Sequence, residues 1–145
     1  MTQLTESIWI GDSSITWRTV RSAKIGAVLN VAQDLKGDLG WPNVEYMQVG
    51  LIDGPGNPTA SYIAAVLALS SLLERHRRVL VCCHTGSRSV VVAMMLLNIT
   101  ANHDWNGLLV LLKERVDTEL PVPHEAHKIA FDNMNWELLA SLRQC

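Results

Sequence analysis

The segment with the clearest chemical potential runs from Cys82 to Ser89, with the sequence Cys-Cys-His-Thr-Gly-Ser-Arg-Ser. In it, a cysteine is followed after a short polar stretch by Arg88. The backbone N–H groups of a tight loop that leads into a helix can surround an anion of phosphate size. An arginine adds a planar fork that binds two oxygens of such an anion at once. The same positive surroundings favour the thiolate of a nearby cysteine, which is the nucleophilic form.

Two cysteines of this segment are candidates for the nucleophile. Five residues separate Cys82 from Arg88, and four separate Cys83 from it. We favour Cys82, because five intervening residues leave enough backbone to surround the three oxygens of a phosphoryl group, whereas four form a tighter ring. The residues that would bind the phosphate are then Cys83, His84, Thr85, Gly86, Ser87 and Arg88.

A second candidate for chemistry is Asp53, which opens the strongest turn signal of the chain, Asp53-Gly54-Pro55-Gly56-Asn57-Pro58. Transfer of a phosphoryl group to sulfur leaves an alkoxide or a phenoxide, which needs a proton. A positioned carboxylic acid supplies it and typically contributes about 10²–10⁴-fold to the rate. Asp53 is therefore the candidate general acid.

The elements that must position these residues alternate between strands and helices early in the chain, and helices dominate later. The apolar runs predict strands at Ile8–Ile10, Ile25–Val31, Val44–Val49 and Val79–Val81. Caps and helical spacing predict helices from Asp12–Ser14 to about Arg21, from Thr59 to the basic run Arg75–Arg78, and over Val90–Leu97, Asp104–Val116 and Glu125–Leu142. Gly37, Asp38, Gly40 and Pro42 mark a loop.

This order predicts an α/β fold with a mostly parallel central sheet flanked by helices, formed by residues 1–145 as a single domain. Val90–Leu97 is apolar all round and should be a buried central helix. Ligands of such sheets lie beyond the carboxyl ends of the strands. The turn after Val81 and the turn that holds Asp53 are both in that position.

The composition restricts the classes of function. The chain has 145 residues, 48% of them hydrophobic, and a formal charge of −2. We therefore expect a folded domain with no basic face for nucleic acid or anionic lipid. The apolar stretches are shorter than the roughly 20 residues of a membrane span, so no membrane partner is expected.

Cysteine usage and the first residues suggest a compartment. Three cysteines cannot form a disulfide framework, and Met1–Glu6 holds no apolar signal segment, so we expect a cytoplasmic protein. Cys82, Cys83 and His84 do not suggest a metal site, because three successive side chains do not easily converge on one ion.

Beyond these local features, the segment Cys82–Ser89 resembles the C-x5-R signature loop of the cysteine-dependent protein tyrosine phosphatases. The resemblance extends over about Ile8–Leu139 and is closest to the small, atypical dual-specificity phosphatases. It rests on Ile8–Asp12, Ile25–Val31, the acid-loop-like Leu51–Pro55, Lys113–Val116 and the proline-rich stretch to His124. There are two departures, since Val81 stands where the family usually has His, and Thr85 where it usually has Gly.

The resemblance implies a protein phosphatase that hydrolyses phosphotyrosine, phosphoserine or phosphothreonine through a phosphocysteine, with a phosphorylated protein or peptide as substrate. It implies that Cys82 attacks phosphorus, Arg88 and the loop amides hold the phosphoryl group, and Asp53 protonates the leaving oxygen. A hydroxyl at Ser89 would hydrogen-bond the thiolate. No metal and no cofactor are implied, because the loop and Arg88 supply the positive charge.

Two alternatives stay open at this point. The segment from Cys83, Cys-His-Thr-Gly-Ser-Arg-Ser, also resembles the shorter loop of rhodanese-type sulfurtransferases, with Cys83 as nucleophile. The departures from the phosphatase pattern also allow a catalytically inactive module that only binds phosphate.

Overall fold

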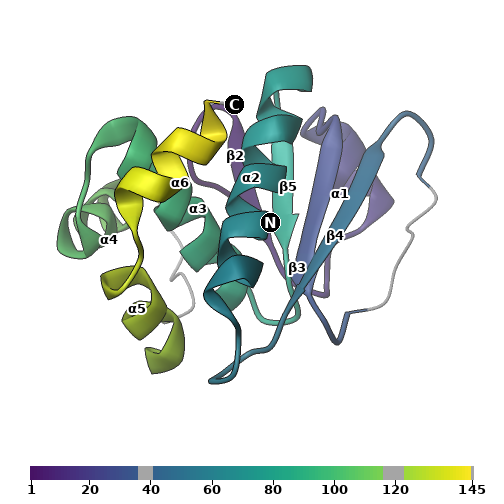
Figure 1. Ribbon diagram of the computed structural model, residues 1–145. Helices are drawn as coiled ribbons and strands as arrows, with labels where there is room; N and C mark the ends of the chain where they lie inside the picture. Colours follow the sequence, from purple (N-terminus) through teal and green to yellow (C-terminus); the bar gives the residue numbers. More distant parts are fainter. Residues whose placement is uncertain (36–40, 116–122, 145) are drawn as a thin grey trace.

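A computed structural model describes residues 1–35, 41–115 and 123–144 (Figure 1). In this part of the chain, five strands form one sheet in the order β1-β2-β5-β3-β4. β1 is antiparallel to β2, and the other neighbouring strands are parallel. The strands are β1 (Thr2–Gln3), β2 (Ile8–Gly11), β3 (Ala27–Ala32), β4 (Glu45–Leu51) and β5 (Val79–Cys82). The predicted α/β fold with a mostly parallel sheet is confirmed.

Helices cover both faces of the sheet, as Figure 1 shows. α2 and α3 pack against one face, and α4, α5 and α6 pack around them. α1 lies on the opposite face, where its Val20 packs with Val28 and Leu80 of the central strands. The helices are α1 (Trp17–Ser22), α2 (Thr59–Arg75), α3 (Ser87–Ala101), α4 (Trp105–Arg115), α5 (Glu125–Asp132) and α6 (Trp136–Arg143).

Side chains of the central strands alternate between two apolar clusters, as the pleat requires. Val79 and Val81 of β5 face the larger cluster under α2 and α3, whereas Leu80 and Cys82 face the smaller one under α1. The residues of α3 are buried from Ser87 to Leu96, in line with the predicted central helix. β5 is thus buried on both faces and leads directly into the most buried helix.

The carboxyl ends of β3, β4 and β5 lie at the same edge of the sheet because these strands are parallel. Asp34 follows β3 by two residues, Asp53 follows β4 by two residues, and Cys83 follows β5 directly. This edge therefore gathers two carboxylates and a thiol.

Two helices begin differently from the expectation. Thr16, rather than Asp12–Ser14, caps α1, because its hydroxyl accepts from the backbone N–H of Thr19. Asp12 instead forms a tight turn in which its carboxylate accepts from Ser14 N. Pro58, not Thr59, takes the cap position of α2, and it has no side-chain hydrogen bond there.

The last predicted helix, Glu125–Leu142, is divided into α5 and α6. Asn133 ends α5, and the Asn135 side chain accepts from Leu138 N to begin α6. Asparagine is more favourable at helix caps than in a helix interior. The apolar face that continues through residues 125–142 therefore wrongly predicted one helix instead of two. The short strand β1 was not predicted. The expected loop residues Gly37, Asp38 and Gly40, and the end of the expected helix at Val116, lie outside the described residues.

No helix among the described residues has the length and apolar character that crossing a bilayer requires.

Replacing Leu29 by Ala should lower the free energy of unfolding by about 2–5 kcal/mol, because Leu29 is fully buried in β3 and the change leaves a cavity. The matched change Leu138→Ala should cost no more than about 0.5 kcal/mol, since Leu138 is 45% exposed on α6. Urea unfolding followed by circular dichroism measures both. Equal losses would show that the central sheet is not the main core.

Candidate active site

The loop between β5 and α3 is a single tight turn formed by residues 83–86. Gly86 has a φ of 92°, in the left-handed region that glycine adopts without strain. Its backbone N–H donates to Cys83 Sγ at 3.0 Å, which closes the turn over the start of α3. The loop is also held to the neighbouring strand, because Cys83 N donates to Gly11 O and Ser13 N donates to His84 O.

The two cysteines lie on opposite faces of the sheet. Cys82 still belongs to β5 and points into the cluster under α1, where burial raises the pKa of its thiol to about 12. Cys83 is the first residue after the strand, and its sulfur lies inside the loop. The structure therefore corrects the expected register. Cys83, with four residues between it and Arg88, is the cysteine of the loop, and the strand ends one residue later than the spacing argument assumed.

Ser89 lies beside this sulfur, in the first turn of α3. Its hydroxyl is 3.5 Å from Cys83 Sγ and donates to Gly86 O at 2.8 Å. The expected proximity of Ser89 to the candidate nucleophile is thus present for Cys83.

Arg88 is the largest charged side chain at the site and is only 1% exposed. Its Nη1 donates to Leu51 O and to Asp34 Oδ1, both at 2.7 Å. The Arg88 hydrogen bond keeps the pKa of the exposed Asp34 carboxyl below its usual value. Nε and Nη2 of Arg88 are buried and make no hydrogen bond within the described residues. A buried guanidinium with two unused donors is suited to an anion with two acceptor oxygens.

The other residues expected to bind phosphate surround Cys83 in one turn. His84 and Thr85 are exposed at the rim, whereas Gly86 and Ser87 are buried. The Ser87 hydroxyl donates to Asp53 Oδ1 at 3.2 Å, so the loop and the predicted acid are in direct contact. The structure therefore brings together the predicted loop and the predicted acid, although the two are separated by more than thirty residues in the chain.

The segment that holds Asp53 is shaped by Asn57. The Asn57 side chain accepts from Ile52 N and donates to Ile52 O, each at 2.7 Å, which closes the turn. Gly54 and Gly56 have φ values of 147° and 104°, which residues with a side chain rarely adopt, so this turn needs glycine at both positions. Asp53 itself is partly exposed, with a side chain 34% accessible.

Sequence reasoning missed three residues of this site. Asp34 could have been found, because it follows a predicted strand at the same sheet edge as Asp53. His127 and Tyr62 had no local signal: His127 Nε2 lies 3.2 Å from Asp53 Oδ1, and its Nδ1 lies 2.7 Å from Tyr62 Oη.

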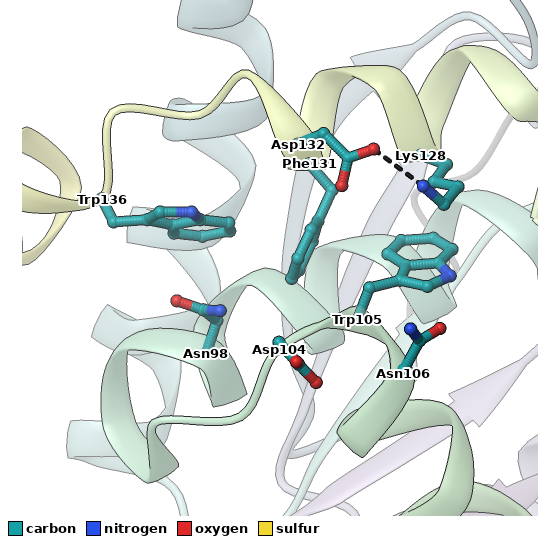
Figure 2. A pocket seen from close by; sticks show the side chains of 8 residues that line it. All are labelled: Asn98, Asp104, Trp105, Asn106, Lys128, Phe131, Asp132 and Trp136. Atoms are coloured by element: carbon teal, nitrogen blue, oxygen red, sulfur yellow. Dashed lines mark hydrogen bonds and ion pairs between the residues drawn. The ribbon is translucent and has the colours of Figure 1, made fainter.

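A separate cleft of about 320 Å³ lies among α3, α4, α5 and α6 (Figure 2). Figure 2 shows the Lys128–Asp132 ion pair at its wall, with the aromatic rings of Trp105, Phe131 and Trp136 around it. The cleft shares no lining residue with the loop or with the Asp53 turn. Its lining residues are Asn98, Asp104, Trp105, Asn106, Lys128, Phe131, Asp132 and Trp136.

No family model matches the sequence. The chain is 30% identical to dual specificity protein phosphatase 14 of Mus musculus over 99 residues, which are 66% of this chain and 50% of that protein. It thus spans about half the length of this curated relative. The solved structure of DUSP15 is 16% identical, has a TM-score of 0.82 and matches over 99% of this chain and 92% of that chain.

The chain is therefore similar in sequence to a dual-specificity phosphatase and has the fold of solved structures of that kind. The solved structure of human DUSP28 also matches this fold, with a TM-score of 0.77 and 16% identity. The match covers 99% of this chain and 98% of that chain. With Cys83 as the loop cysteine, Gly86 falls three residues later, where the dual-specificity phosphatase pattern has its glycine. Compared with the C-x5-R pattern, this loop is then one residue shorter, and the missing residue lies between Gly86 and Arg88.

At pH 7, iodoacetate should modify Cys83 and leave Cys82 as the free thiol. Both thiols are buried, but burial raises the pKa of Cys82 to about 12, whereas Cys83 Sγ lies in the loop and accepts a backbone N–H at the start of α3. Mass spectrometry of the peptide that contains both cysteines measures the label. Cys82→Ala should keep the label and Cys83→Ala should lose it; the opposite pattern would return the nucleophile to Cys82.

Proposed function

We propose that the chain is a cysteine-dependent protein phosphatase that hydrolyses phosphotyrosine, phosphoserine or phosphothreonine through a phosphocysteine on Cys83. The observation that supports this most is the pair of unused, buried donors on Arg88, next to a loop that holds a thiol at the start of a helix. The dual-specificity phosphatases named above supply the reaction class.

In the first step, the Cys83 thiolate attacks phosphorus in line with the leaving oxygen. A sulfur–phosphorus bond forms while the phosphorus–oxygen bond breaks, and its electron pair stays on the departing oxygen. Asp53 gives its proton to that oxygen, so the product is a neutral alcohol or phenol. In the second step, water attacks the phosphorus of the phosphocysteine while Asp53 takes a proton from that water. The sulfur–phosphorus bond breaks, and the Cys83 thiolate leaves.

Arg88 and the loop amides stabilise the charge on the phosphoryl oxygens during both steps. Because Asp34 and Leu51 O hold Nη1 in place, Nε and Nη2 are oriented before the substrate arrives. Donors fixed in advance in a site with little water are the largest electrostatic contribution that a protein offers to such a reaction. Ser89 Oγ is 3.5 Å from the sulfur and would stabilise the leaving thiolate by turning its hydrogen from Gly86 O to the sulfur.

The substrate class that fits this site is a phosphorylated protein or peptide. The loop contains no lysine, which makes a polyanionic lipid headgroup a poorer fit than a single phosphoryl group. A cytoplasmic location agrees with the chemistry, because Cys82 and Cys83 are free thiols and the nucleophile must stay reduced.

One observation favours a second candidate, a rhodanese-like sulfurtransferase. Only four residues lie between Cys83 and Arg88, the shorter of the two loop lengths considered. In that reaction the Cys83 thiolate would take the outer sulfur of thiosulfate, releasing sulfite, and pass it as a persulfide to cyanide. The fold argues for the phosphatase, and the loop length alone argues for the transferase.

The protein should hydrolyse an aryl phosphate without added metal, and orthovanadate should inhibit it whereas EDTA should not. Cys83→Ser removes the thiolate and should abolish turnover, while Cys82→Ala should retain most of the activity because Cys82 lies outside the loop. Release of phosphate from a phosphopeptide measures this. Thiocyanate formation from thiosulfate and cyanide, without phosphate release, would support the transferase; vanadate binding without either activity would indicate a phosphate-binding module.

Asp53→Asn should lower kcat for phosphotyrosine by about 10²-fold or more, because the phenol must leave protonated. The loss should be small for a substrate whose leaving group is strongly acidic and needs no proton. Steady-state kinetics on both substrates gives the comparison. Equal losses would remove Asp53 from the role of general acid.

A further inference from the structure

His127 is a buried residue at the site that the proposed chemistry does not use. It lies on α5, is 0% exposed, and has a partner on each ring nitrogen. Nδ1 is 2.7 Å from Tyr62 Oη, and Nε2 is 3.2 Å from Asp53 Oδ1. The candidate acid is therefore connected to α2 through a histidine 74 positions away in the chain.

The direction of these hydrogen bonds follows from Asn57. Ile52 N donates to Asn57 Oδ1, and Asn57 Nδ2 donates to Ile52 O, so the backbone fixes which end of the amide is the donor. Nδ2 also lies 3.3 Å from Tyr62 Oη. Nδ2 lies at the same distance from Gly54 O, and an amide NH₂ group can only donate, so Asn57 Nδ2 cannot accept the Tyr62 hydrogen.

The Tyr62 proton is consequently free to point at His127. Burial raises the pKa of Tyr62, so its hydroxyl keeps the proton and donates it to Nδ1. Burial likewise lowers the pKa of His127, which keeps the imidazole neutral. The titratable groups that face the ring are Tyr62 on α2, Asp53, Arg88 on α3 and His124 before α5. A neutral ring that accepts at Nδ1 carries its hydrogen on Nε2 and donates it to Asp53.

Two donors thus meet on one oxygen of Asp53. Both Ser87 Oγ and His127 Nε2 lie 3.2 Å from Oδ1. A carboxylic acid whose Oδ1 accepts two hydrogen bonds holds its own proton on Oδ2, because the proton would clash with those donors on Oδ1.

We propose that His127 is a positioning residue that, together with Tyr62 and Asn57, directs the catalytic proton of Asp53 onto Oδ2. This inference rests on the proposed phosphatase function and adds the means by which its acid is oriented. We call the series of hydrogen bonds from Asn57 through Tyr62 and His127 to Asp53 the relay. Its first and last residues, Asn57 and Asp53, belong to the same turn. Its middle members, Tyr62 and His127, hold that turn against α2 and α5.

The test compares two substitutions of the same histidine. His127→Leu removes both hydrogen bonds, whereas His127→Gln keeps an N–H donor near the position of Nε2. The readout is the ratio of kcat for phosphotyrosine to kcat for an aryl phosphate with a strongly acidic leaving group. We expect this ratio to fall about tenfold in His127→Leu, which is a part of the roughly 10²–10⁴-fold that general acid catalysis contributes, and to be largely restored in His127→Gln.

A matched control is Phe131→Leu, which disturbs the packing of the same helix without touching Asp53. It should leave the ratio unchanged even where both rates fall. A ratio that moves equally in Phe131→Leu and His127→Leu would show a structural effect and overturn the inference. A ratio that does not move in His127→Leu, while Asp53→Asn collapses it, would overturn the inference and leave the phosphatase intact.

A second measurement does not depend on turnover. Nitrogen-15 NMR of the imidazole should show the tautomer with hydrogen on Nε2 in the native protein, and Tyr62→Phe should reduce its population. The opposite tautomer in the native protein would overturn the relay. A protein that shows the expected tautomer but hydrolyses no phosphate would refute the proposed phosphatase function, and with it the catalytic role of the relay.

Discussion

The constraint on which the site depends is the burial of a positive charge at the edge of the sheet. The Arg88 guanidinium is 1% exposed, and a buried cation is costly unless it is paired and hydrogen-bonded. The fold meets part of this requirement with a backbone carbonyl from the end of β4 and a carboxylate that follows β3. Two nitrogens remain without a partner in the described chain, so an anion bound there would complete the arrangement and stabilise the fold.

The parallel sheet explains how residues distant in sequence meet around that charge. Three neighbouring parallel strands end at the same edge, and each is followed within two residues by a group the site uses. Helices α2, α3 and α5 then supply Tyr62, Arg88 and His127 from the side of the sheet opposite α1. The similarity to DUSP15 at 16% identity is understandable on these terms, because apolar alternation and strand order can persist while individual residues change.

Much of this arrangement could be predicted from the sequence, since apolar runs and turn residues locate strands and helices directly. The loop, Arg88, Ser89 and Asp53 were found for the same reason: each lies at the end of a predicted element. The register of the cysteines could not be settled in this way, because it depends on whether β5 ends at Val81 or Cys82. A shift of one residue moves a side chain to the opposite face of a sheet. His127 lies within a helix with no signal of its own, and only tertiary contacts reveal its role.

The placement of the two neighbouring cysteines on opposite faces also bears on oxidation. Peroxide converts thiolates to sulfenic acid, and a second thiol nearby often prevents further oxidation by forming a disulfide. Cys82 is adjacent to Cys83 in the chain, yet its sulfur packs beneath α1 while that of Cys83 lies in the loop. A disulfide between them would require β5 to be pulled out of its pairing with β2 and β3. If Cys83 is oxidised to a sulfenic acid, the thiol that reduces it must therefore be one other than Cys82.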